Sequence, residues 1–205
     1  TGYRRDTVIS CLGKLGLEAE TVVPVLVAAS GEQQPTKNYA LRALGNFGPG
    51  AKAALPELRE AMTDLSPPVR LVGARAVWKV SQQSKDVLPV LVAVLKDTSR
   101  PPGSVGGIER LDEGMLLRRE AAQALGEMGP DATEAVLALI VATEDRAPEV
   151  RVEAALALWK VDRQAERPVT TLTKVLELKD SSASQFPLSG AQAVAAEYLG
   201  EIGPT

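Results

Sequence analysis

ALRALGNFGPG, at residues 40–50, recurs 81 positions later as AAQALGEMGPD, at residues 121–131. The match continues without a gap through VRLVGARAVWKV at 69–80 and VRVEAALALWKV at 150–161, and 19 of the 41 aligned positions are identical. A long internal repeat is typical of stacked structural units rather than of one globular core. It therefore predicts a repeat architecture before any single residue is considered.

The repeating block itself divides into two smaller units, each with a leading helix that ends at a recurring dipeptide. Successive dipeptides lie 32, 34, 47, 34 and 40 residues apart, so a basal period near 33 residues is lengthened twice. In the fifth unit, apolar residues fall at i, i+4, i+7, i+8 and i+11, which is one stripe of a helix. The dipeptides are Leu12-Gly13, Leu44-Gly45, Trp78-Lys79, Leu125-Gly126, Trp159-Lys160 and Leu199-Gly200.

A second, trailing helix follows the leading helix in each complete unit. Several trailing helices carry a proline near the start, which a first helical turn tolerates because its N–H needs no partner. Most end in an acidic residue before a turn. The expected trailing helices are roughly Glu20–Ala29, Ala51–Thr63, Asp86–Lys96, Asp131–Thr143 and Arg167–Leu178, and a last leading helix is expected at Gly190–Ile202.

The succession of an acidic turn, Val-Arg, alanines, Leu-Gly and a Gly-Pro turn resembles HEAT repeats, and most closely the short variety named after phycobilisome lyases. The residues that carry it best are Ala121-Ala122, Ala124-Leu125-Gly126, Gly129-Pro130, Asp145, Val150-Arg151, Ala154-Ala155 and Ala157-Leu158. The resemblance covers nearly the whole chain. It implies an all-α fold with leading helices on a convex face and trailing helices on a concave face. Because the same repeat serves enzymes, scaffolds and adaptors, it implies little about function.

Together the repeat and the resemblance predict a right-handed α-solenoid of about five and a half HEAT-like helix pairs, forming a single domain over residues 1–205. The expected units lie at about 3–30, 36–65, 68–97, 115–145 and 148–180, with a half unit at 190–205 and insertions at 98–114 and 181–189.

The composition argues against catalysis and against several ligand classes. The chain has no histidine and one cysteine, which excludes a Ser-His or Cys-His nucleophile pair and an imidazole metal ligand. No Asp-x-Asp-x-Asp-Gly calcium loop appears. We therefore expect no enzymatic activity, no metal and no cofactor.

The charge pattern disfavours nucleic acid and membranes as partners. The chain has 23 basic and 26 acidic side chains, a net charge of −3, and many cations lie on the expected leading helices. Its longest strongly apolar stretch, Val87–Leu95, is much shorter than the roughly 20 residues of a membrane span. The chain begins at Thr1 without a methionine, so we expect a fragment of a longer protein. Its compartment stays open; the cytoplasm is favoured, and a targeting segment could be missing.

Two arginines and two aspartates recur with the repeat and invite comparison with a ligand site. Each arginine follows an acidic turn residue, as an inter-unit structural ladder would require, and we favour that structural role. The four residues are Asp64, Arg70, Asp145 and Arg151. Trp78 and Trp159 replace leucines of other units, so we expect them to fill core volume rather than to form an aromatic platform.

Two features point toward a partner. Three apolar trailing segments, Val22–Ala29, Val87–Leu95 and Val136–Ala142, are expected in the core, but valines on the concave side would form an apolar groove for a helix or peptide. The two insertions follow trailing helices at equivalent places, and solenoid loops commonly carry binding specificity. Passive surface loops are the alternative. The candidate partner-binding residues are Arg100, Ile108, Glu109, Arg110, Leu111 and Phe186.

These observations predict a non-catalytic scaffold that binds a protein or peptide, or part of its own parent chain, through the concave face and edge loops. The alternative is an accessory subunit of a bilin or other cofactor lyase, as the family resemblance implies.

Overall fold

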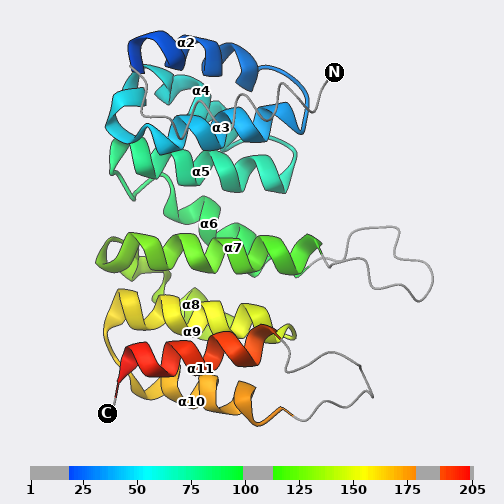
Figure 1. The fold of residues 1–205 in the computed structure, drawn as a ribbon, viewed down its shortest axis with the longest axis vertical. Coiled ribbons are helices and arrows are strands. Elements are labelled where there is room, and N and C mark those ends of the chain that lie inside the picture. The colour runs from blue at the N-terminus through cyan, green and yellow to red at the C-terminus, as the bar shows by residue number, and fades with distance from the viewer. Residues whose placement is uncertain (1–18, 99–112, 179–189, 204–205) are drawn as a thin grey trace, which may run out of the picture. The chain divides into compact units, whose positions relative to one another are not determined.

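The computed structural model describes residues 19–98, 113–178 and 190–203 (Figure 1). Within these ranges the ordered elements are helices and none is a strand. The predicted all-α fold class is therefore confirmed. The first expected leading helix and most of both insertions lie outside the described residues. The chain forms two compact units, Thr1–Val90 and Leu91–Thr205.

The first unit packs successive helices against one another around a leucine-rich core. Helix α3 packs on α2 and α5, and α4 packs on α5. Leucines with no more than 1% exposure fill the space between them, namely Leu26, Leu41, Leu44, Leu58 and Leu71. The elements are α2 (Ala19–Ser30), α3 (Thr36–Asn46), the 3₁₀ helix η1 (Gly48–Ala54), α4 (Leu55–Ala61) and α5 (Pro67–Ser81).

Helix α6 (Leu88–Lys96) leads into the second unit, which repeats the same pattern. Helix α9 packs on α7, α8 and α10, and α11 packs on α10 and α9. Val152 of α9, Leu172 of α10 and Ala195 of α11 are buried in one cluster. The elements are α7 (Glu113–Met128), η2 (Gly129–Ala135), α8 (Val136–Ala142), α9 (Pro148–Asp162), α10 (Glu166–Leu176) and α11 (Gly190–Ile202).

The trailing helices expected at 51–63 and 131–143 are each split in two, which corrects the sequence prediction. The leading helix ends where Gly48 and Gly129 take positive φ values of 55° and 57°, and a 3₁₀ segment follows. Ala51 and Ala132 then depart from helical geometry, with φ/ψ of −97°/21° and −100°/18°. The α-helical part of each trailing segment is consequently only seven residues long.

The other expected helices match the structure closely. Helices α2 and α10 begin one residue before the predicted starts, and α11 has the predicted bounds. Helix α7 begins at Glu113, two residues inside the stretch expected as the insertion 98–114. Apolar periodicity thus predicts the starts of these helices to within two residues.

Candidate interaction surfaces

Helix α8 exposes an apolar surface instead of being buried all round. Leu137 and Val141, one helical turn apart, are 77% and 68% exposed, while Leu139 is fully buried on the opposite side. Ile140 lies half-buried beside them. We call Leu137, Ile140 and Val141 the α8 ridge. Of the three apolar trailing segments, this one leaves two large apolar side chains exposed on consecutive turns; the predicted groove itself stays a prediction.

The other two apolar trailing segments are mostly core. Val22, Val23 and Leu26 are buried in α2, and Val25 is the one large hydrophobic side chain of this helix that is exposed, at 56%. In the segment Val87–Leu95 most of the valines and leucines are buried as well, namely Val87, Leu88, Leu91, Val94 and Leu95. The core interpretation therefore holds for most of these residues.

An exposed ion pair lies at the end of the α8 ridge. Glu144, one turn beyond Ile140, lies 3.8 Å from the ammonium of Lys174 on α10, and both side chains are about two-thirds exposed. The apolar surface thus has a charged border, which is the usual arrangement of a protein-binding patch.

Two ion pairs occupy equivalent positions of the repeat but differ in burial. Lys37 Nζ lies 2.7 Å from the Asp64 carboxylate, and Arg118 Nε lies 2.8 Å from that of Asp145. The side chains of the first pair are 27% and 24% exposed, whereas those of the second are 0% and 7% exposed. Arg118 donates a second hydrogen bond to Asp145, at 3.2 Å, so its guanidinium binds both carboxylate oxygens.

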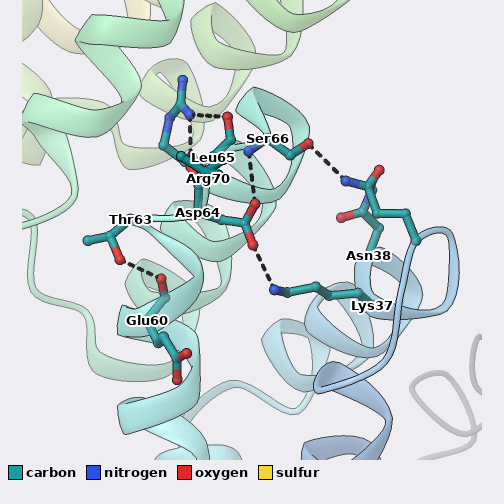
Figure 2. Close-up of polar contacts among 9 residues, drawn as sticks. Lys37, Asn38, Glu60, Thr63, Asp64, Leu65, Ser66 and Arg70 are labelled. Atoms are coloured by element: carbon teal, nitrogen blue, oxygen red, sulfur yellow. Dashed lines mark hydrogen bonds and ion pairs between the residues drawn. The ribbon is translucent and has the colours of Figure 1, made fainter.

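Each aspartate also organises the turn that precedes the next leading helix. Asp64 accepts a hydrogen bond from the backbone N–H of Ser66, and Asp145 accepts one from Ala147, both at 2.8 Å. Figure 2 shows Asp64 between Lys37 and Ser66. The hydrogen bond from Lys37 is the main cause that lowers the pKa of Asp64, and the bond from Ser66 adds to it.

The two repeated arginines bind backbone rather than the aspartate carboxylates. Arg70 donates to the carbonyls of Asp64 and Leu65, both at 2.9 Å (Figure 2). Arg151 donates to the carbonyl of Asp145 at 2.9 Å. Each arginine therefore holds the turn before its own helix.

The cations that pair with these aspartates were not predicted, although the sequence contains a signal for the pairing. Lys37 and Arg118 both stand 27 residues before their aspartate and lie at equivalent repeat positions. Opposite charges that recur together at a fixed offset indicate a pair. The predicted ladder of Asp64, Arg70, Asp145 and Arg151 did not include the two cations that bind the aspartate carboxylates.

The tryptophans are less buried than the core prediction requires. Trp78 and Trp159 are both half-buried. The guanidinium of Arg163 lies 5.0 Å from the centroid of the Trp159 ring, within the range of a cation–π contact. Trp159 thus packs partly against the protein and also contacts Arg163, the residue that follows α9.

The predicted loop residues Arg100, Ile108, Glu109, Arg110, Leu111 and Phe186 lie outside the described residues. Their role as partner contacts stays a prediction. Among the residues that the structure does describe, no cluster of acidic or cysteine side chains is arranged to hold a metal ion. No helix in the same part of the chain has both the length and the apolar character needed to cross a membrane.

Comparison with known families places the repeated ion pairs in context. The PBS lyase HEAT-like repeat family matches residues 37–64 and 117–145. Each matched segment contains one cation of a pair and ends at its aspartate. Over these two segments the chain is similar to PBS lyase HEAT-like repeats. The family resemblance drawn from the sequence is thereby confirmed.

Solved structures that resemble this HEAT-like repeat chain include the complex of CpcE and CpcF of phycocyanin lyase from Nostoc sp. PCC7120. The sequences are 23% identical, the match covers 98% of this chain and 71% of that one, and the TM-score is 0.65. At this identity the likeness establishes the fold alone. The comparison with curated proteins gave no match.

Proposed function

We propose that this HEAT-like repeat chain is a non-catalytic protein-binding module that uses the α8 ridge as a contact surface. The observation that carries the proposal is the exposure of Leu137 and Val141 on consecutive turns of one helix. Burying a side chain of this size stabilises a complex by about 1.5–3 kcal/mol. Two such side chains with a charged border suit an apolar helix or peptide of a partner protein.

A similar solved structure is consistent with this kind of function. The similar solved structure is itself a complex of two proteins. The absence of histidine from the sequence removes the commonest catalytic base and supports a binding role.

The repeat supplies a well-matched variant for testing the proposal. Val141 is equivalent to Glu60 of the first repeat, so V141E introduces the side chain that the equivalent helix α4 carries at this position. We expect L137E/V141E to keep the melting temperature within about 3 °C, because both side chains are exposed. Capture of partners from a lysate of the source organism, compared by quantitative mass spectrometry, should fall at least fivefold for a specific subset.

Leu65 provides the control, since it is 97% exposed but stands alone in a turn. L65E should leave the captured set unchanged. Identical profiles for L137E/V141E and the unaltered protein would count against the α8 ridge as a contact surface.

A second candidate is an accessory subunit of a lyase that attaches bilins to proteins. Two repeats of the PBS lyase type and the similarity to a phycocyanin lyase complex favour it. The test is absorption spectroscopy of the protein purified with and without added bilin. A shifted and enhanced bilin band would support the candidate, and unchanged spectra of the bilin would reject a direct bilin-binding role.

A further inference from the structure

Helices α3 and α5 cross in close contact at Gly45, and an open pocket lies at this crossing, lined by residues of both helices. A Cβ atom added to Gly45 would lie 3.1 Å from Cα of Ala76, so only glycine fits this crossing without displacement. The pocket has a volume of about 160 Å³, which is enough for a carboxylate group and its neighbouring atoms. Its lining consists of Arg42, Gly45, Asn46, Val72, Arg75, Ala76 and Lys79.

The charges around this α3–α5 pocket have one sign. Arg42 comes from α3, and Arg75 and Lys79 come from successive turns of α5; no acidic side chain lines the pocket. The chain as a whole is acidic, with a net charge of −3, so three cations at one crossing are a local feature. Both arginines also take part in interactions within the protein, and the five donors of a guanidinium leave capacity for a further acceptor.

In the second repeat, α7 and α9 cross in the same way, but different side chains surround the crossing. A Cβ on Gly126 would lie 3.0 Å from Cα of Ala157, so the backbones approach as closely as in the first repeat. At the positions equivalent to Arg42, Asn46, Val72 and Arg75 the chain carries Gln123, Glu127, Glu153 and Leu156.

At the second crossing, the carboxyl group of Glu153 has a raised pKa. Burial raises the pKa of Glu153, whereas Arg119 and Lys160 oppose this shift, and the charge of Glu127 adds the smallest contribution, an increase. The second crossing keeps one cation, Lys160 at the position of Lys79, but carries Gln123 and Leu156 where the first has Arg42 and Arg75. Close packing of the two helices therefore accounts for the crossing itself, but not for the two arginines of the first one.

We propose that the α3–α5 pocket binds the carboxylate side chains of an acidic segment in a protein partner. Arg42 and Arg75 provide planar donor pairs that match a carboxylate, and Lys79 adds a third positive charge. A single pocket between two helices suits a few carboxylates better than a long phosphate backbone, which requires an extended basic surface. The inference does not depend on the α8 ridge.

The test is the binding of a fluorescein-labelled octaglutamate peptide to the whole chain, measured by anisotropy at low salt. The variant R42Q/R75L replaces two pocket residues with those of the second repeat, whose crossing tolerates them. We expect its affinity for the peptide to fall at least tenfold with an unchanged melting temperature. K52T/K85Q removes two exposed charges of the same unit outside the pocket and should lower the affinity less than threefold.

Three outcomes would overturn the proposal. The first is no binding of the peptide by the unaltered chain, and the second is equal weakening by the two double variants, which would indicate a diffuse charge effect. The third is tighter, pocket-dependent binding of an oligothymidine of matched charge. L137E/V141E should retain peptide binding, so failure of the α8 ridge and failure of this pocket are distinguishable.

Discussion

At the scale of single residues, burial separates two ion pairs that the repeat makes equivalent. Arg118 is fully buried and its partner Asp145 nearly so, whereas Lys37 and Asp64 are partly in water. Removing one member of a buried pair leaves an uncompensated charge, at a cost of about 3–5 kcal/mol, while an exposed pair contributes about 1 kcal/mol or less.

We therefore expect R118A to reduce the free energy of unfolding by about 3–5 kcal/mol and K37A by at most about 1 kcal/mol, measured by urea denaturation. R118K, which installs the cation found in the first repeat, should recover part of the loss. Equal costs for R118A and K37A would contradict the difference in burial.

Asp64 predicts how stability depends on pH. Its pKa in the folded protein is lowered below the ordinary value of 3.8, chiefly by the hydrogen bond from Lys37. A lowered folded pKa stabilises the protein above the unfolded pKa, and this contribution disappears as the pH falls through the folded value. D64N should thus be less stable than the unaltered chain at pH 7, by about 1 kcal/mol.

The difference should shrink as the pH falls below about 4 in urea midpoints measured at several pH values. In a K37A background the pH-dependent part should be smaller, because the main cause of the shift is gone. A difference that is constant from pH 7 to pH 2.5 would exclude this role for Asp64.

At the scale of elements, apolar periodicity in the sequence predicts where the helices lie. Each leading helix that the structure describes has a continuous apolar stripe, and the structure places it where expected. The split of the trailing segments at Ala51 and Ala132 was not predictable, because alanine fits α and 3₁₀ geometry alike and breaks no pattern. Trailing helices are therefore recognised as helical but not as two pieces.

The sequence names Val136–Ala142 as a possible partner surface, but its exposed side could not be assigned, for a related reason. Val136–Ala142 contains no polar residue, so nothing in its pattern marks which side faces water. Only the packing of α8 on α9 shows that Leu137 and Val141 lie outside the contact. The ion pairs had a signal in the recurring 27-residue offset, but their unequal burial is a tertiary property.

At the scale of the whole molecule, repeat architecture implies that stability is local. Units of a repeat protein are stabilised mainly by nearest neighbours, so a defect at one crossing should loosen only the helices that meet there. Gly45 and Gly126 offer the same change at two separate crossings, α3 with α5 and α7 with α9. Valine at either position overfills the contact, at a cost of about 1–3 kcal/mol.

Hydrogen exchange followed by mass spectrometry should therefore respond differently to the two variants. G45V should accelerate exchange in α3 and α5 and leave α7 and α9 unchanged, and G126V should do the reverse. Gly200, where a Cβ meets no atom within 4 Å, provides the control, and G200V should alter neither pair. Uniform acceleration by G45V across all four helices would mean that the chain unfolds as one cooperative core, and the local account of the repeat would be wrong.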